Sequence, residues 1–354
     1  MAKTIDGRLA YADLLRSVAV IAVIVVHIAG SQMESVGVTS SAFRVFTVYD
    51  GLAHWCVPVF IMLSGMFLLD PKRELTLGKL FFHHILRIFV ALVVWAVIYA
   101  LVAAVAAGGP LDWPAVKAAL YRVLLGNTHY HLWFLYMIIG LYLVTPILRA
   151  FVRGASRSDF RYFFLVVFVF ASLIPTILRI RPSQTLSTYV GYLNIHLVLG
   201  YVGYYVLGYY LKAYTLSRPA EFLIYLLGIA GAAVTVGGTL VRSQLQGRLA
   251  HTFYNYDSPN VALMSVAVFV LFRYVLGVSD ERSRRQRMSG VARISFGIYL
   301  VHDLFIMLLR HFGITPLSFS PILSVPVLTA VVFLCSFAVA WALSKIPFLG
   351  RYLT

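Results

Sequence analysis

The repetition of long apolar runs constrains the fold of this 354-residue chain more than any other sequence feature. Each run is about 20 residues long, which is the length a helix needs to cross a bilayer. The runs lack the alternation of a lipid-facing barrel strand, and only helices or closed barrels satisfy the backbone in lipid. We therefore predict an all-α, polytopic transmembrane helical bundle with about ten spans. The expected spans are residues 10–29, 52–69, 80–106, 131–149, 162–180, 193–212, 220–241, 259–277, 294–312 and 323–344.

The composition supports this class and predicts an orientation. Charged residues make up 12% of the chain and the net charge is +16, whereas soluble proteins average about 25% charged residues. Ten spans place both termini on one side, and 18 of the 29 Lys and Arg residues lie on that side, against 8 on the other. The positive-inside rule then places both termini in the cytoplasm. The positive charge is thus explained by topology, and we expect no nucleic-acid partner and a single membrane-embedded domain over residues 1–354.

The first span carries ionisable residues, which are costly inside a membrane and indicate function. Arg16 and His27 are eleven residues apart, so on a helix they return to nearly the same face, roughly 16 Å apart along the axis. Val20 and Val23 fall between them on that face. The alternative is that Arg16 extends to the lipid headgroups and that His27 is an interfacial residue.

Further polar residues fall within or beside other spans. His84 and Arg87 lie three apart at the start of the third span, where cations can bind a phosphorylated ligand or simply extend to the headgroups. His302 and Asp303 lie mid-membrane in the ninth span and should face a polar interior. The histidines lack carboxylate or cysteine partners at ligand spacing, so we expect no metal site. The fourth span opens with an aromatic and histidine cluster that contains His131, Trp133 and Tyr136.

Two shorter segments carry structural predictions. Residues 108–128 suggest an amphipathic helix that begins near Pro114, with Asp112 as its cap. In the second span, the Ser64–Gly65 pair is typical of close helix packing.

Taken together, these residues resemble the acyltransferase-three family of integral membrane acyltransferases over nearly the whole chain, and most of all the branch that O-acetylates bacterial surface glycans. One departure is that this chain has His84 where the family often has the first arginine of an Arg-x-x-Arg pair. The matching motifs are Arg16 to His27, the run 57–65, the runs 131–136 and 141–146, and the run 294–302.

The resemblance implies a multi-pass protein of the bacterial inner membrane that uses cytoplasmic acyl-CoA, usually acetyl-CoA, and modifies a glycan or lipid-linked glycan at the outer side. Arg16, Arg87 and His84 would then hold the CoA head. His27 would act as general base toward the acceptor hydroxyl or accept the acyl group itself. Residues expected to contact the acceptor or to orient His27 are Glu34, His131, Trp133, Tyr136 and His302.

Other functions compete with acyl transfer. A transporter or flippase of a lipid-linked glycan would use the polar spans as a path and His27 as a proton relay, although paired carboxylates and an internal repeat are missing. A scaffold for glycan assembly leaves Arg16 and His27 unexplained. The identity of the acceptor, acetyl against succinyl or another acyl group, direct transfer against an acyl-histidine route, and the oligomeric state are all left open by the sequence.

Overall fold

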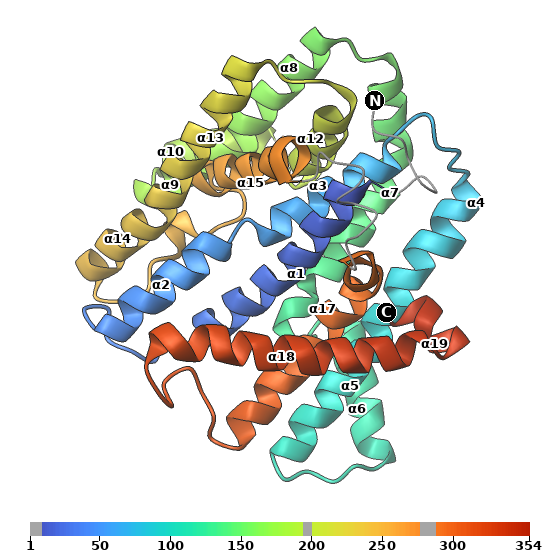
Figure 1. Ribbon diagram of the computed structural model, residues 1–354, viewed down its shortest axis with the longest axis vertical. Coiled ribbons are helices and arrows are strands. Elements are labelled where there is room, and N and C mark those ends of the chain that lie inside the picture. Colours follow the sequence, from blue (N-terminus) through green and yellow to red (C-terminus); the bar gives the residue numbers. More distant parts are fainter. Residues whose placement is uncertain (1–8, 194–199, 277–287) are drawn as a thin grey trace. The chain divides into compact units, whose positions relative to one another are not determined.

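The computed structural model describes residues 9–193, 200–276 and 288–354, and these residues form helices with no strand among them (Figure 1). The prediction of an all-α polytopic protein is therefore confirmed. Within the described ranges, nine helices are long and apolar enough to cross a membrane. They are Ala10–Gly30, Ser41–Leu68, Leu77–Ala106, Tyr130–Gly154, Arg157–Ile180, Arg218–Gln246, Pro259–Leu276, Gly290–His311 and Pro321–Ser344.

The expected spans differ most from these helices at two places, and the other bounds agree to within about five residues. The second helix begins at Ser41 rather than at residue 52, because residues 41–53 form a capped helical extension before the apolar run. Of the expected span 193–212, residues 194–199 lie outside the described residues, and the part described is the twelve-residue helix α12 (Val202–Ala213). Residues 1–8 and the basic residues of 277–287, which entered the topology count, also lie outside them. The cytoplasmic placement of the termini stays a prediction.

The chain divides into two compact units. The first comprises Met1–Lys72, Leu148–Arg293 and Thr315–Val331, and the second comprises Arg73–Ile147, Ile294–Ile314 and Val332–Thr354. The long helices α7 (Trp133–Gly154), α17 (Met288–His311) and α18 (Pro321–Ser344) contribute residues to both. The single domain over residues 1–354 stays a prediction.

Close backbone contact between two helices organises the first unit. A Cβ atom at Gly65 would lie 1.8 Å from the carbonyl oxygen of Tyr205, and one at Gly208 would lie 1.9 Å from that of Met62. Only glycine fits at such a crossing, so the packing role predicted for Ser64–Gly65 is confirmed. The helices of this unit are α1 (Ala10–Gly30), α2 (Ser41–Ala53), α3 (Cys56–Leu68), α8 (Arg157–Val167), η3 (Phe168–Leu173), α9 (Ile174–Ile180), α10 (Gln184–Leu193), α12, α13 (Arg218–Ala233), η4 (Val234–Gly238), α14 (Thr239–Gln246), η5 (His251–Phe253), α15 (Pro259–Leu271) and η6 (Phe272–Leu276).

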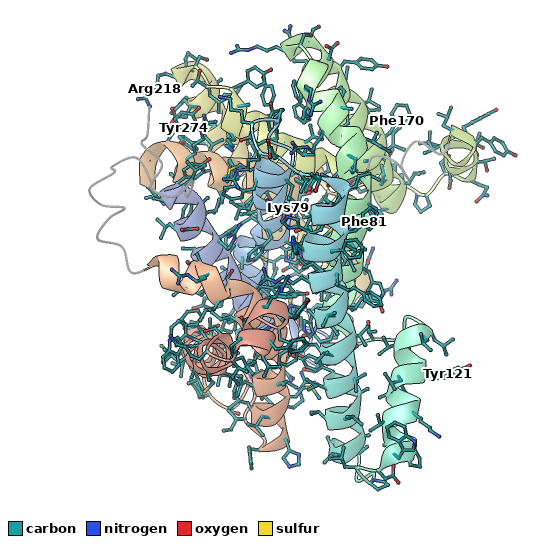
Figure 2. The ribbon with its side chains drawn as sticks, turned by 90° about the vertical axis from the view of Figure 1, so that its right-hand side faces the viewer. Lys79, Phe81, Tyr121, Phe170, Arg218 and Tyr274 are labelled. Atoms are coloured by element: carbon teal, nitrogen blue, oxygen red, sulfur yellow. The ribbon has the colours of Figure 1, made fainter. Side chains whose placement is uncertain are left out.

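The second unit is built around α5 (Leu86–Ala106), which contacts α6 (Trp113–Leu124) and α19 (Pro347–Tyr352). The prediction of a short helix in 108–128 is confirmed, because the Asp112 side chain accepts a hydrogen bond from the Ala115 N–H at 2.9 Å and caps α6. Lys79 and Phe81 mark the start of the long helix in Figure 2. There the chain passes from α4 (Leu77–Lys79) through the π-helix η1 (Leu80–Ile85) into α5, while η2 (Tyr130–Leu132) precedes α7.

Candidate functional site

The Arg16–His27 face of α1 is turned toward protein. Val20 and Val23, which lie between the two residues on that face, are only 0% and 2% exposed. Arg16 and His27 themselves are half-buried, and the Arg16 Cζ atom lies 5.8 Å from the centre of the Phe67 ring on α3. A lipid-facing stripe would leave these valines exposed. Therefore the simple interfacial explanation of both residues does not fit this helix.

Three cations gather around the end of α3 in the first unit. Arg149 Nη1 donates to the carbonyl oxygens of Leu68 at 2.6 Å and Asp70 at 2.9 Å. Lys212 Nζ lies 2.6 Å from Asp70 Oδ2 and 5.7 Å from the centre of the same Phe67 ring that Arg16 approaches.

Arg16, Arg149 and Lys212 therefore outnumber the single carboxylate of Asp70 among them, which makes the cluster suited to an anion. The sequence indicated Arg149 and Lys212 only as part of the positive-inside excess, because they are far from Arg16 along the chain.

Arg87 and His84 belong to the second unit. The Arg87 Nη2 atom donates to the main-chain oxygen of Thr354, and its Cζ atom lies 5.5 Å from the centre of the Phe296 ring. The His84 ring meets Tyr142 edge to face at 6.2 Å. Arg16 belongs to the other unit. The binding of one ligand by Arg16, Arg87 and His84 together therefore stays a prediction.

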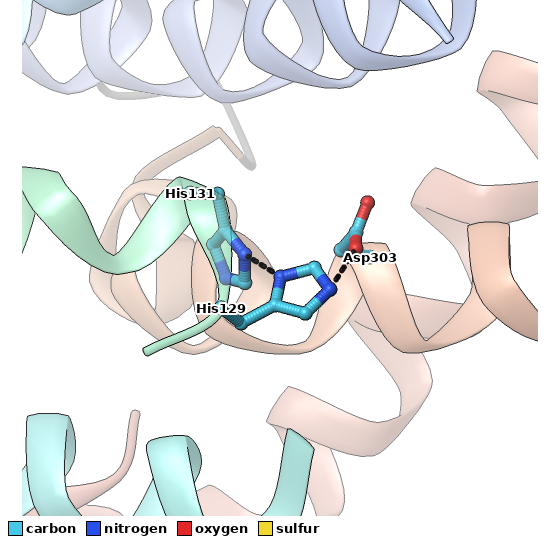
Figure 3. A group of neighbouring side chains, drawn as sticks. All are labelled: His129, His131 and Asp303. Carbon is cyan, nitrogen blue, oxygen red and sulfur yellow. Dashed lines mark hydrogen bonds and ion pairs between the residues drawn. The ribbon is translucent and has the colours of Figure 1, made fainter. Parts of the chain in front are cut away.

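A buried polar network in the second unit joins η2 to α17 (Figure 3). The Nδ1 atoms of His129 and His131 are 2.9 Å apart, and His129 Nε2 lies 3.3 Å from Asp303 Oδ2. The Tyr130 hydroxyl donates to the other carboxylate oxygen of Asp303 at 2.8 Å. His131 and Asp303 are 1% and 3% exposed, so an aromatic and histidine cluster and a carboxylate 172 residues apart meet inside the protein.

Hydrogen-bond donors and acceptors in this network follow from the geometry. A neutral His129 that donates from Nε2 to Asp303 must accept at Nδ1 from His131, which leaves Nε2 as the basic nitrogen of His131. His302 donates from Nδ1 to the carbonyl oxygen of Tyr299 at 2.5 Å, so its basic nitrogen is also Nε2. The ring centres of His131 and His302 are 5.3 Å apart. The Tyr299 hydroxyl donates to the carbonyl oxygen of His131. Asp303, His129 and His131 thus form a hydrogen-bonded relay that can pass a proton between the two imidazoles, and His302 lies beside it.

Burial sets the charge of His129. Removal from water lowers the pKa of His129, an effect that the Asp303 carboxylate opposes and the Arg310 cation reinforces. The Tyr99 ring stacks on the imidazole with centroids 4.4 Å apart. His129 is thus held mainly neutral at pH 7, as the relay requires.

The same three side chains meet the distance test for a metal site. Ligand atoms of His129, His131 and Asp303 all lie within 4.8 Å of one another in the described part of the chain. The expectation that the histidines lack a carboxylate partner was wrong, because folding brings Asp303 beside His129. However, His129 faces His131 with one nitrogen and Asp303 with the other, whereas a metal would need both partners on one side of the ring. The absence of a metal site stays a prediction.

A second carboxylate–imidazole pair, missed in the sequence, lies in the first unit. His54 Nδ1 is 3.1 Å from Asp50 Oδ1, and both residues are buried. The imidazole is stacked between Tyr254 and Tyr256, at 4.8 and 4.9 Å between ring centres. An Asp and a His four residues apart on a helix were visible in the sequence, but only the stacking distinguishes them from a surface pair.

This pair lies at the depth of His27. The Tyr11 hydroxyl contacts Met66 Sδ at 3.1 Å, where α1 meets α3. His27 is 16 residues beyond Tyr11, and Asp50 is 16 residues before Met66. At 1.5 Å per residue, both lie about 24 Å from that contact on neighbouring helices.

The remaining predicted residues are more exposed. Glu34 lies 3.7 Å from His251, and its side chain is 78% exposed. Trp133 and Tyr136 near the start of α7 are 36% and 39% exposed, so they can contact a ligand or lipid. His131 and His302 are the predicted acceptor residues that the fold brings together.

Comparison with known proteins identifies the family. A family model described as an acyltransferase domain, that of the acyltransferase-3 family, matches residues 9–343. No curated protein matches the chain, and no solved structure matches it.

Proposed function

We propose that this chain, which belongs to the acyltransferase-3 family and is a multi-pass membrane acyltransferase, is an O-acetyltransferase of a glycan. It would take the acyl group from cytoplasmic acetyl-CoA and transfer it to a hydroxyl of a cell-surface or lipid-linked glycan at the outer side of a bacterial inner membrane. The observation that carries the proposal is the α1 face. A cation and an imidazole sit on one protein-facing stripe, roughly 16 Å apart along the helix axis.

The donor head would bind at the cation cluster of the first unit. Acyl-CoA carries several phosphates on its head and a long, thin arm that ends in the thioester. Arg16, Arg149 and Lys212 surround Phe67 and Asp70 at the end of α3, and arginine is well matched to phosphate. Arg87 and His84 remain expected donor contacts by family resemblance. The arm would run along α1 from Arg16 to His27.

His27 would perform the proton chemistry. Its neutral imidazole takes the proton from the acceptor hydroxyl as the oxygen attacks the thioester carbonyl. The carbon–oxygen bond forms, the carbon–sulfur bond breaks, and the proton passes to the departing CoA sulfur. In the alternative route, the imidazole attacks first and the acyl group rests on His27 before the hydroxyl takes it. Both routes use the same residue and give the same products.

The acceptor would be held by polar and aromatic groups. His131 and His302 would hydrogen-bond to sugar hydroxyls or accept protons through the relay that ends at Asp303. Trp133 and Tyr136 offer partly exposed rings of the kind that contact sugars. Among these residues, the relay geometry supports the assignment of His131.

The test is mass spectrometry of cell-surface glycans from cells that make the protein or its variants. We expect a mass increase of one acetyl group with the wild type, and a loss of about 100-fold or more in that product with His27→Ala. Arg16→Ala should lower it at limiting acetyl-CoA. The control is Arg153→Ala, at an exposed arginine. Normal acetylation by His27→Ala, at a normal amount in the membrane, would remove His27 from the mechanism.

A further inference from the structure

A large apolar groove lies in the first unit, apart from the residues assigned above. Its volume is about 740 Å³, within the range of pockets that bind small molecules. Four segments line it: α8 with η3 and α9, α10, α12, and α15. Phe170, labelled in Figure 2, projects from η3 and belongs to this lining. Ser172, Ala262 and Asp257 also line the groove.

The wall of the groove departs from regular helix at the groove itself. Residues Phe168–Leu173 form the π-helix η3, and Pro175 follows in the first turn of α9. Such π-helical turns occur frequently at functional sites. The described residues contain four of them, η1, η3, η4 and η6, and η3 is the one that lines the groove. Ser172 on this turn is 8% exposed, and its hydroxyl has no hydrogen-bond partner among the residues that the structure describes. A buried hydroxyl in an apolar wall is costly unless a ligand satisfies it.

One end of the groove, at its lining residue Asp257, lies beside an excess of positive charge, and this end is called the mouth. Arg179 pairs with Asp257 at the groove and donates to the Ser258 hydroxyl at 3.1 Å. Arg242 donates to the carbonyl oxygen of Arg179 at 3.0 Å. Neither Arg242 nor the exposed Arg181 forms an ion pair with an acidic residue in the described part of the chain. Arg179 and Arg242 beside one carboxylate, with the exposed Arg181 two residues after Arg179, match a phosphate attached to a hydrocarbon chain.

The mouth also adjoins the carboxylate–imidazole pair at the depth of His27. Asp257 directly follows Tyr256, whose ring stacks on His54, and the Tyr256 carbonyl oxygen accepts from the Tyr204 hydroxyl at 2.6 Å. A phosphate held by the arginines would therefore place an attached sugar over the loop of Tyr256 and Asp257. An ordinary bilayer phospholipid carries no glycan that could occupy this position.

We propose that this groove binds the acceptor as a lipid-linked glycan, with a single long hydrocarbon chain in the groove and its phosphate at Arg179, Arg181 and Arg242. The inference rests on the proposed function, because it specifies the acceptor of that reaction. Bulk lipid gains little by leaving the bilayer for an apolar groove, since lipid tails are as apolar as the lining. Selectivity must then come from the phosphate at the arginines and from the shape of the groove.

The experiment measures binding without acetyl-CoA. The protein is placed in nanodiscs of phosphatidylcholine that contain a radiolabelled long-chain polyprenyl phosphate, then re-extracted, and the label retained per protein is counted. We expect about one probe per wild-type protein and a loss of about tenfold with Ala262→Trp, which fills the groove. Arg242→Gln, which removes a cation at the mouth, should lose a similar amount. The matched control is Ile229→Trp, at a position on α13 that is 68% exposed.

Each outcome decides the proposal. Wild-type retention by Arg242→Gln would overturn it. Displacement of the probe by phosphatidylglycerol as effectively as by unlabelled polyprenyl phosphate would identify an ordinary lipid site and overturn it too. Probe binding without acetyl transfer would contradict only the proposed function. Acetyl transfer by a wild type that retains no probe would contradict only the groove assignment.

Discussion

Substitution of Gly65 by alanine should push helices α3 and α12 apart. The same change should lower the affinity of the donor site for acetyl-CoA. The new Cβ would lie 1.8 Å from the carbonyl oxygen of Tyr205, whereas carbon and oxygen atoms normally approach no closer than about 3.3 Å. The obstacle is main chain and cannot rotate away. Helices α3 and α12 must therefore move apart by about 1.5 Å at this crossing.

The separation has a cost in stability and in ligand binding. Overpacking of this kind costs typically 1–3 kcal/mol, and we expect about 3 kcal/mol because the clash involves backbone. Lys212 in the last turn of α12 lies 2.6 Å from Asp70, just beyond α3. A shift of about 1.5 Å would break this contact, so the affinity for acetyl-CoA should fall several-fold.

The assay is thermal unfolding in mild detergent, with and without acetyl-CoA. Gly140→Ala is the matched control, because a Cβ there meets nothing within 4 Å and alanine favours a helix by up to about 1 kcal/mol. Gly208→Ala opens the same crossing, so the double variant with Gly65→Ala should lose less stability than the two single losses added together. A Gly65→Ala protein with the wild-type Tm and acetyl-CoA affinity would refute the reasoning.

Three further predictions concern the charged residues of the two units. Lys212→Met should abolish most of the protection that acetyl-CoA gives against heat, whereas Arg153→Met, at an exposed position on α7, should keep it; equal protection in both variants would contradict the donor site. Burial lowers the pKa of His129, so the folded protein binds that proton more weakly than the unfolded chain and loses stability as the pH falls below about 6.5. The drop in Tm between pH 7.5 and 5.5 should therefore be smaller in His129→Gln, and an identical drop would show that His129 is not responsible. If His129, His131 and Asp303 form a proton relay, dialysis against EDTA should leave acetyl transfer unchanged, and a loss that zinc restores would establish a metal site instead.

The candidate site divides into residues that sequence could reveal and residues that it could not. Arg16 and His27 lie on one helix, so their shared face follows from helical periodicity alone, and the burial of Val20 and Val23 shows which way that face turns. Arg149 comes from a different helix and has no periodic relation to them. Its role near Asp70 depends on tertiary packing.

The sequence by itself determined that this chain is a helical membrane protein, since apolar length and the need to satisfy the backbone in lipid leave no other fold. It also determined the capped helix at Asp112 and marked Gly65 as a position suited to close helix packing, because both depend on local chemistry. Only the tertiary structure decided that Asp303 lies beside His129, that two tyrosines enclose His54, and that an apolar groove opens at a π-helical turn. Those features join segments far apart along the chain, and no local pattern encodes which segments will meet.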